Sequence, residues 1–470
     1  MNKNDELIGN VSAIGSNMEG IVRVNDFICF VPFAIIGEKI KFKVLKITKN
    51  IAFCKLLEVL TPAEERVRPR CCVYEKCGGC QLQHLRYRDQ LKMKTELVSD
   101  CLKKIANIEK KVSNCIKSDC EYEYRNKLQL PVRNTDFGDK IGFFAPNSHR
   151  IIEIVNCPLQ QPWNSTVISA FNEYLSASKT PCYNEKTAIG LIRHLVVRAV
   201  DNHLLIVLVI NGAELKDVDL LVEILSKKIG KFSLFLNVNT QNNNVILGEK
   251  FIHVYGKKFI ETEEFDIKYQ VVPESFLQVN NYVKRKLYLD VLKTVDADSE
   301  TVVIDAYSGA GLMTALFGKT AKAVYGIEIV KEAVESAELL AKNNGLSSVV
   351  KNYVGSCEEL LPNLIKQLRE NNDKISVVLD PPRKGCDKKV LQAILSALPD
   401  KIVYVSCSPQ TLARDLGVLT GSLHYEGNEL KKSNDFTPIY NIEKIQPYDM
   451  FPQTKHVETL VCLTRVNHNI

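Results

Sequence analysis

The 470-residue sequence predicts an α/β protein in three parts: a small β-barrel, a mixed α/β segment and a Rossmann-like parallel sheet. From about residue 300, five short apolar runs alternate with helical sequence, which is the pattern of a parallel sheet covered on both faces. The first sixty residues instead alternate short apolar runs with Gly and Asn turns, as all-β modules do. We expect the boundaries at residues 1–61, 62–265 and 266–470.

The composition is that of a globular protein, with 45% hydrophobic and 25% charged residues. No stretch approaches the ~20 uninterrupted apolar residues of a membrane-spanning helix, and the first ten residues hold no apolar signal core. We therefore expect a cytoplasmic protein with no membrane partner, and a monomer as the simplest assembly. The net charge of +6 supports a nucleic-acid partner only weakly.

In the barrel segment, one expected strand has an apolar and a positive face, because side chains alternate with period two. Its inner residues are Ile40, Phe42 and Val44, and its outer residues are Lys39, Lys41 and Lys43. Small RNA-binding barrels present such a positive face. Lysines that protect an exposed strand edge give the same pattern, and both interpretations stay open.

The middle segment begins with basic residues on both sides of a cysteine cluster: Arg66, Arg68, Arg70, Arg86, Arg88, Lys92 and Lys94. Further along, residues 191–200 and 203–212 are apolar runs that predict a pair of strands. Residues 217–230 have the periodicity of an amphipathic helix.

Four of the fifteen cysteines are grouped in a way that suggests ligands, because a reduced compartment gives no disulfide framework. Cys71, Cys77 and Cys80 lie close together, and Cys157, followed by proline, could complete the set. Four thiolates suit zinc or an iron-sulfur cluster. Three close cysteines with one remote cysteine favour a cluster, with a structural role, and the neighbouring Cys72 is a less favoured ligand.

Several polar residues fall at the carboxyl ends of the expected parallel strands, where such sheets bind ligands. Asp305 ends the first of these strands, and a turn with two glycines follows it. Glu328 ends the next strand, 23 residues further on, which is close to the ~20-residue offset of an acid that binds ribose hydroxyls. The spacing of three glycines typical of a dinucleotide site is missing, which favours S-adenosylmethionine, a ligand without a pyrophosphate.

Two further strand ends complete the expected pocket. Asp380 precedes two prolines, whose fixed φ angles make a rigid turn that presents its carboxylate. Cys407 lies between a strand and a helix that starts near Pro409, and the helix dipole is expected to lower the pKa of its thiol.

A thiolate at this position suits one reaction in particular. Carbon 5 of uracil is a weak nucleophile, but addition of a thiolate at carbon 6 makes an enolate that accepts a methyl group. The proton on carbon 5 must then leave, which requires a general base. Glu458, at the start of an apolar strand, is the candidate, and burial would raise its pKa into a useful range.

Together these residues closely resemble the bacterial 23S ribosomal RNA (uracil-5-)-methyltransferases, within the RNA 5-methyluridine methyltransferase family, over essentially the whole chain. The first sixty residues resemble the family's TRAM domain, an OB-like barrel, and the last part resembles its class I methyltransferase domain. The cysteine pattern resembles its [4Fe-4S] site. The resemblance implies that S-adenosylmethionine contacts Gln278, Tyr307, Glu328 and Asp380, that Cys407 is the nucleophile and that Glu458 is the base. Ser308 and Leu312 depart from the family's usual residues in the glycine loop.

The resemblance also implies that the target base is flipped out of the RNA, which the chemistry requires as well, because a stacked pyrimidine hides carbon 6. Arg125 and Lys127 are candidate RNA contacts, although a solvated charged strand would look the same. The barrel and the four cysteines favour 23S ribosomal RNA over transfer RNA, whose enzymes generally lack both. An inactive RNA-binding module with a redox-sensing cluster and a DNA cytosine methyltransferase are the less favoured alternatives.

Overall fold

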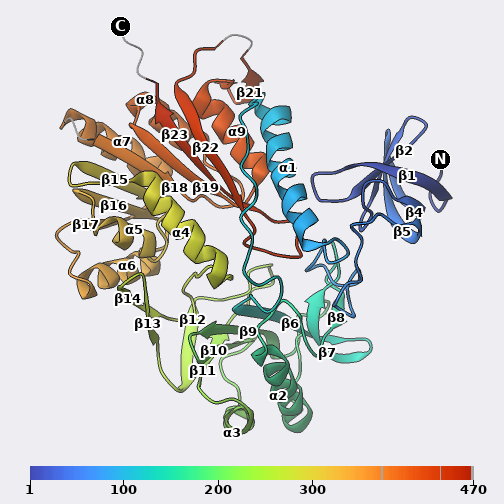
Figure 1. The fold of residues 1–470 in the computed structure, drawn as a ribbon. Helices are drawn as coiled ribbons and strands as arrows, with labels where there is room; N and C mark the ends of the chain where they lie inside the picture. The colour runs from blue at the N-terminus through green and yellow to red at the C-terminus, as the bar shows by residue number, and fades with distance from the viewer. Residues whose placement is uncertain (372–373, 434–435, 467–470) are drawn as a thin grey trace.

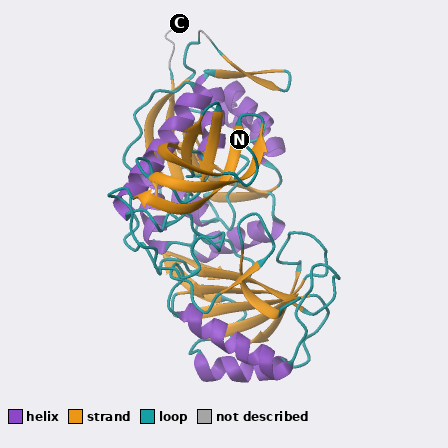
Figure 2. Ribbon diagram, turned by 90° about the vertical axis from the view of Figure 1, so that its right-hand side faces the viewer, coloured by secondary structure: helices purple, strands orange, loops and turns teal. Residues whose placement is uncertain are grey.

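The computed structural model describes residues 1–371, 374–433 and 436–466. Three units are visible in Figure 1: a barrel at the N-terminus, a central sheet, and a C-terminal sheet covered by helices. Figure 2 shows from the side that helices lie on one face of the central sheet and on both faces of the C-terminal sheet. In these described ranges no helix combines the length and the apolar character needed to cross a membrane.

The N-terminal unit is a closed barrel of five strands in the order β1-β2-β3-β5-β4. Its strands are β1 (Glu6–Ile14), β2 (Gly20–Val24), β3 (Phe27–Val31), β4 (Lys39–Thr48) and β5 (Ile51–Thr61). Ile40, Phe42 and Val44 are fully buried inside it. The lysines that alternate with them lie outside, so the two predicted faces of this strand are confirmed.

Arg66, one of the basic residues at the start of the expected middle segment, fastens the barrel to the segment that follows it. Its guanidinium donates to both carboxylate oxygens of the fully buried Glu38 and to the carbonyl of Phe33, at 2.7 Å. A bidentate pair of this kind fixes geometry as well as charge. Arg66 is therefore a structural residue, because a buried carboxylate needs a partner.

The central sheet has seven strands in the order β12-β11-β10-β9-β6-β7-β8. They are β6 (Lys127–Thr135), β7 (Gly138–Phe144), β8 (Ile151–Glu153), β9 (Ile192–Val200), β10 (His203–Ile210), β11 (Phe232–Val238) and β12 (Lys250–Tyr255). The predicted pair of apolar strands is confirmed as antiparallel β9 and β10. The predicted amphipathic helix is α3 (Val218–Lys228), which packs with α2 (Trp163–Ser178) on one face of the sheet (Figure 1).

The C-terminal sheet has the order β17-β16-β15-β18-β19-β23-β22. Its strands are β15 (Thr301–Ala306), β16 (Ala323–Glu328), β17 (Val350–Val354), β18 (Lys374–Leu379), β19 (Lys401–Ser406), β22 (Tyr440–Tyr448) and β23 (Glu458–Arg465). The first five are parallel, as the sequence predicts, and β23 pairs antiparallel with β19. The chain order reverses between β15 and β18, which is where sheets of this kind bind ligands.

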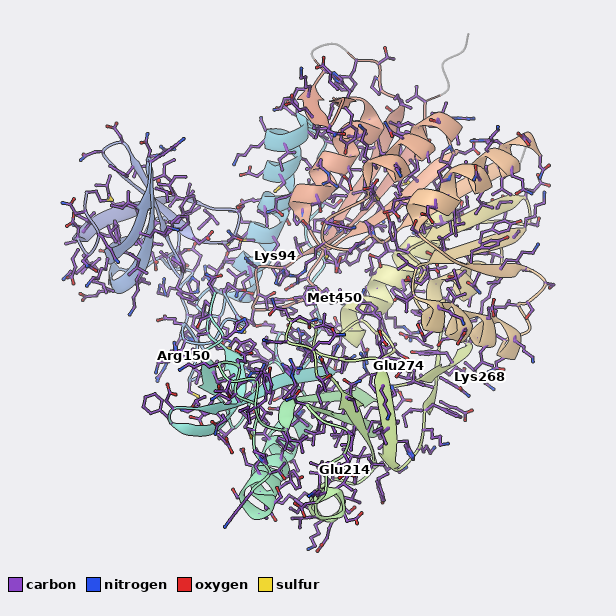
Figure 3. All side chains as sticks on the ribbon, turned by 180° about the vertical axis from the view of Figure 1, so that it is seen from behind. Lys94, Arg150, Glu214, Lys268, Glu274 and Met450 are labelled. Carbon is purple, nitrogen blue, oxygen red and sulfur yellow. The ribbon has the colours of Figure 1, made fainter. Side chains whose placement is uncertain are left out.

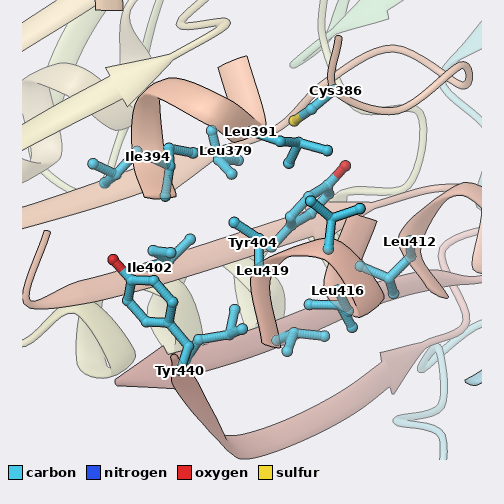
Figure 4. Packing of buried hydrophobic residues seen from close by; sticks show 14 of the residues in the cluster. Leu379, Cys386, Leu391, Ile394, Ile402, Tyr404, Leu412, Leu416, Leu419 and Tyr440 are labelled. Carbon is cyan, nitrogen blue, oxygen red and sulfur yellow. The ribbon is translucent and has the colours of Figure 1, made fainter. Parts of the chain in front are cut away.

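Helices cover both faces of this sheet. They are α4 (Asn281–Val295), α5 (Leu312–Phe317), α6 (Lys331–Asn343), α7 (Cys357–Glu370), α8 (Lys388–Ala397) and α9 (Pro409–Thr420). Figure 4 shows Leu391 and Leu416, from α8 and α9, packed around Tyr404 of β19. Burial of such side chains stabilises the fold by roughly 1.5–3 kcal/mol each, so the strand ends that carry the polar residues rest on a rigid base.

One helix from the expected middle segment packs with the C-terminal unit. This is α1 (Tyr87–Ala106), whose Val98 and Leu102 join the apolar cluster under α9. Lys94 on the same helix donates to Asp449 at 2.5 Å, and both side chains are fully buried. Figure 3 shows Lys94 and Met450 near the centre of the molecule, where α1 meets the loop before β23. The central unit and the C-terminal unit are therefore interleaved along the chain.

Two small antiparallel hairpins complete the described fold. They are β13 (Ile260–Glu264) with β14 (Ile267–Val271), and β20 (Leu423–Glu426) with β21 (Glu429–Lys432). The first lies between the central sheet and α6, and Lys284 of α4 donates to its Glu264 at 2.6 Å. This contact ties the hairpin to the C-terminal unit.

Candidate active site

A cavity of about 980 Å³ opens at the carboxyl ends of β15, β16, β18 and β19. This volume lies within the range of small-molecule sites. All six residues predicted for the cofactor and the reaction line it: Gln278, Tyr307, Glu328, Asp380, Cys407 and Glu458. Residues 180 positions apart in the sequence thus meet in one place. Parallel strands bring the carboxyl ends that carry Glu328, Asp380 and Cys407 to one edge of the sheet, while Gln278 comes from the loop before α4 and Glu458 from the start of the antiparallel β23.

The glycine loop after β15 forms the floor of the cavity. Tyr307 has a positive φ of 66°, and Gly311 has a φ of 82°. A Cβ at Gly311 would lie 2.5 Å from the Cβ of Ala337 on α6, so only glycine lets the loop pass the helix this closely. A Cβ at Gly309 would meet nothing within 4 Å, which leaves space on the cavity side.

Glu328 is held at the end of β16 by backbone donors. The amide of Gly309 donates to its Oε2 at 3.0 Å, and the amide of Val330 donates to its Oε1 at 2.9 Å. Each carboxylate oxygen can accept a further hydrogen bond. Two vicinal hydroxyl groups, such as those of a ribose, match this acceptor.

On the opposite wall, Gln278 is buried, and its main chain is fixed by the central unit. The side-chain amide of Asn126 donates to the carbonyl of Gln278 at 3.0 Å and to the side chain of Asn281 at 3.1 Å. The position of this wall therefore depends on the packing of the central unit against the C-terminal unit.

Two carboxylates near the switch point share a raised pKa. Burial raises the pKa of Asp305 to about 6, although Thr314 donates to it at 2.6 Å. The side chain of Asp380 is exposed to the cavity, but protein surrounds it. The resulting loss of hydration and the charge of Asp305 raise its pKa. A cationic ligand beside these groups would restore their charge, and the sulfonium of S-adenosylmethionine is such a cation.

The structure corrects the expected ionisation of Cys407. The helix α9 does follow it, beginning at Pro409, but burial and the carboxylate of Glu458 raise the pKa of Cys407 to about 11. Desolvation and a nearby anion oppose the thiolate more strongly than one helix end favours it. The guanidinium of Arg383 acts in the opposite direction and lowers this pKa.

Glu458 is the first residue of β23, and strand pairing explains its place beside Cys407. Ser406 pairs with Thr459, so the residues on either side of this pair come to the same end of the sheet. Only 5% of Glu458 is exposed, and its Oε2 has no hydrogen-bond partner among the described residues. Burial and the charge of Asp380 raise its pKa well above its usual range, as predicted. In its carboxylate form, a group with a raised pKa and a free oxygen is a good proton acceptor.

Three residues that lie near Cys407 or Glu458 in the cavity lining were not predicted as site residues. Arg383 is the cation that favours the charged forms of both Cys407 and Glu458. The run Asp-Pro-Pro-Arg could have indicated this residue, since the rigid turn that presents Asp380 also positions the backbone of the arginine that follows. Phe451 and His456 line the cavity from the loop before β23, and burial lowers the pKa of His456 to about 4. No sequence pattern indicates these two residues, because their place in the cavity depends on the tertiary conformation of the loop.

The four predicted ligand cysteines converge beside the barrel and the central unit. Every pair among Cys71, Cys77, Cys80 and Cys157 is close enough for electrostatic interaction between the sulfurs. Burial and the other thiols raise the pKa of Cys80 to about 12 and that of Cys157 to about 11. Over residues 1–371, 374–433 and 436–466, no three His, Cys, Asp or Glu side chains have the spacing of ligands to one metal ion.

Backbone amides also point at these sulfurs. The amide of Gly79 donates to Cys77 Sγ at 3.4 Å, and other main-chain amides do the same for Cys71 and Cys157. Such donors stabilise thiolates, and they surround the sulfurs that hold iron-sulfur clusters. The donor set therefore fits a cluster bound by thiolates.

A parallel sheet with this strand order and a cofactor cavity at its switch point defines a class of protein, the S-adenosylmethionine-dependent methyltransferases. The fold is similar to that of the Pyrococcus abyssi tRNA (uracil-54, C5)-methyltransferase, solved in complex with S-adenosyl-L-homocysteine, with a TM-score of 0.74. The likeness covers 97% of this chain and 100% of that chain, at 24% sequence identity.

The family model described as tRNA (uracil-5-)-methyltransferase matches residues 86–466. A protein of Clostridium tetani described as an uncharacterized RNA methyltransferase is 40% identical, over 97% of this chain and 95% of its own length. A protein of Staphylococcus epidermidis with the same description is 36% identical, over 98% of both chains. The protein belongs to the tRNA (uracil-5-)-methyltransferase family and is an RNA (uracil-5-)-methyltransferase.

Proposed function

We propose that the protein methylates carbon 5 of a flipped uridine through a covalent adduct between Cys407 and carbon 6. One observation carries the proposal: a thiol and a buried carboxyl with a free oxygen lie together in the cavity that holds the expected cofactor residues. Neither group alone indicates this reaction. Their meeting supplies both the nucleophile and the base that it needs.

When bound, S-adenosylmethionine supplies an electrophilic methyl group. The thiolate of Cys407 forms a bond to carbon 6, and the electron pair of the carbon 5–carbon 6 double bond moves into an enolate. Carbon 5 then forms a bond to the methyl group, and the electron pair of the broken sulfur–methyl bond stays on the sulfur, which leaves as a neutral thioether. Glu458 removes the proton on carbon 5, the double bond returns, and the carbon–sulfur bond breaks. The guanidinium of Arg383 favours the charged form of Cys407 at the first step.

RNA containing 5-fluorouracil tests the adduct, because the fluorine on carbon 5 cannot be removed as a proton. We expect a covalent complex with the wild-type enzyme in the presence of S-adenosylmethionine, and none with Cys407→Ala. Cys357→Ala is the matched control, since this second thiol also lines the cavity and its loss should leave the adduct intact. A complex that survives the loss of Cys407 would refute the mechanism.

A variant of the base tests the second half of the reaction. With ordinary RNA, Glu458→Gln should form the adduct and methylate it but release it slowly, so that methylated RNA accumulates on the protein. Methylation and release at wild-type rates would assign the base to another residue.

We propose 23S ribosomal RNA as the substrate, supported by the N-terminal barrel and the four converging cysteines. The barrel does not exclude transfer RNA, because the likeness to the Pyrococcus abyssi transfer RNA enzyme extends over 97% of this chain. Transfer RNA is therefore the second candidate. Mapping 5-methyluridine in both RNAs from cells that lack the protein decides between them: loss from 23S RNA alone supports the first, and loss from transfer RNA alone supports the second.

We also propose that Cys71, Cys77, Cys80 and Cys157 hold a [4Fe-4S] cluster. The support is their mutual proximity and the amides directed at their sulfurs. The cluster would fasten residues 71–80, next to the barrel, to the loop at Cys157. It would have a structural role, because methyl transfer involves no change of redox state.

Anaerobic reconstitution tests this site with a built-in control. We expect four iron and four sulfide per chain, and a loss of both with Cys157→Ser. Cys72→Ser should keep the full content, because this exposed thiol lies next to Cys71 but is not proposed as a ligand. Bound zinc with no sulfide in the wild-type protein would overturn the assignment.

A further inference from the structure

A buried arginine in the central sheet has no partner. Only 5% of Arg198, on β9, is exposed, yet its guanidinium makes no hydrogen bond or ion pair with any residue in the described ranges. Its Nη1 is completely shielded from solvent. Protein structures rarely bury an arginine without a carboxylate, because removing a charge from water is costly. An unpaired buried cation therefore suggests that its partner comes from outside the chain.

Two further cations lie in the same group as Arg198. Lys127 on β6 is its direct cross-strand neighbour, and Arg125, two residues before Lys127, donates through Nε to the carbonyl of Lys127 at 3.2 Å. Burial lowers the pKa of Lys127 to about 8, and the positive charges of Arg198 and Arg125 act in the same direction. No carboxylate among the described residues forms an ion pair with any of the three. Three cations held together without an anion form a binding site for one.

Arg198 and Lys127 face the C-terminal unit. Val196 and Val200, two residues before and after Arg198, belong to an apolar cluster with Ile260 and Val271 of the β13–β14 hairpin. Side chains two apart on a strand share a face, so Arg198 and Lys127 lie on this side. Figure 1 shows α2 and α3 on the other side of the central sheet, away from the C-terminal unit.

This group of cations also adjoins the active-site cavity. The main-chain amide of Asn126, between Arg125 and Lys127, donates to the carbonyl of Val279 at 3.0 Å, next to Gln278 of the cavity wall. Burial lowers the pKa of the cavity residue His456, and several cations act in the same direction, Arg125 among them. An anion bound here would thus lie close to the entrance used by a flipped base.

We propose that Arg198, Lys127 and Arg125 form an anion site that binds a backbone phosphate of the RNA beside the target uridine. The proposal rests on the proposed function, since it takes the flipped uridine as the group in the cavity. Arginine offers a planar fork of donors that matches two phosphate oxygens, and the lysine adds a point charge. The phosphate compensates the buried guanidinium, so the site is completed only when RNA binds.

The test combines RNA binding with stability. We expect Arg198→Met to weaken binding of a labelled uridine-containing stem-loop about tenfold, and to reduce the slope of log affinity against log salt by about 1. Its melting temperature should stay equal or rise, because an uncompensated buried charge is removed. Its affinity for S-adenosylmethionine should not change. Arg198→Lys should retain most of the salt slope.

Two other variants frame the result. Lys127→Gln, at a half-buried position, should lower the salt slope in the same way and decides the matter if Arg198→Met does not fold. Lys216→Gln is the matched control, because it removes one charge from an exposed loop on the α3 side. Figure 3 shows Glu214, two residues before it, at the far end of the central unit. This control should bind RNA as the wild type does.

Several outcomes would overturn the proposal. One is unchanged RNA affinity and salt slope in folded Arg198→Met and Lys127→Gln proteins. Another is a joint fall of melting temperature and S-adenosylmethionine affinity, which marks a purely structural arginine. A third is stabilisation by inorganic phosphate that depends on Arg198 while RNA binding does not. Binding is measured without turnover, so absence of the 5-fluorouracil adduct would refute the proposed function and leave this test unaffected.

Discussion

The ionisation of Cys407 gives the sharpest test of the active-site geometry. Burial and Glu458 raise its pKa to about 11, whereas Arg383 lowers it. At pH 8 a thiol with this pKa is about one part in a thousand thiolate, while an unperturbed thiol of pKa ~8.5 is about a quarter ionised. In the absence of RNA, alkylation of Cys407 should therefore be about 200-fold slower than that of an unperturbed thiol.

Iodoacetamide labelling, followed by peptide mass spectrometry, measures this directly for each cysteine. The rate at Cys407 should rise about tenfold per pH unit from pH 7.5 to 9.5, because the reactive thiolate increases in that proportion below its pKa. The exposed thiol of Cys72 reports the reactivity of the reagent in the same sample. Removing the anion with Glu458→Gln should move the profile to lower pH, and removing the cation with Arg383→Gln should move it to higher pH.

The opposite directions of these two shifts make the test specific. General loosening of the cavity would move both variants toward the profile of a free thiol. A rate at Cys407 that is already constant above pH 7 would refute the reasoning, because it would mean that the helix end dominates over burial. A shift to higher pH in Glu458→Gln would refute the placement of this carboxyl beside the thiol.

Three further outcomes follow from the packing around the site. Lys94→Met should lower the free energy of unfolding, measured in urea, by about 3–5 kcal/mol, because it leaves Asp449 buried and unpaired. Adding Asp449→Leu should recover most of this loss, and no recovery would show that the ion pair is not the cause. Gly311→Ala should weaken S-adenosylmethionine binding at least tenfold by calorimetry, since its Cβ would overlap Ala337, and wild-type affinity would contradict the loop geometry. Glu328→Gln should weaken the same binding about tenfold, worth about 1.4 kcal/mol, without changing RNA affinity; a loss of RNA affinity instead would place this residue at the RNA.

Local pattern was sufficient for most of the fold. The alternation in the lysine-rich strand predicts the inside and outside of the barrel, because the two faces differ in hydrophobicity at every second residue. The regular exchange of apolar runs and helical sequence predicts the parallel sheet of the C-terminal unit. The sequence pattern could not show that α1 packs against the C-terminal unit, since the apolar face of a helix does not specify which sheet it covers.

Part of the residues that line the candidate site could also be predicted from local pattern. The rule that ligands bind at strand ends selects Glu328, Asp380 and Cys407, and each lines the cavity. Arg198 could not be selected, because an arginine in an apolar strand looks like any other until the packing shows that its Nη1 is buried with no hydrogen-bond partner among the described residues. Arg66 illustrates the reverse case: the sequence shows it only as part of a basic stretch, and the structure pairs it with a buried glutamate.

The sequence by itself therefore determined the order and type of the elements, and it selected Glu328, Asp380 and Cys407 as residues that arrive at one edge of a sheet. These predictions depend on periodicity and on the position of a residue at the end of its strand, and both can be recognised in short stretches of sequence. The tertiary structure alone decided the charge environments: Cys407 is harder to ionise than its place before a helix suggests, and Arg198 has no ion-pair partner within residues 1–371, 374–433 and 436–466. Ionisation depends on burial and on charges brought together from distant parts of the chain, and only the folded packing specifies those.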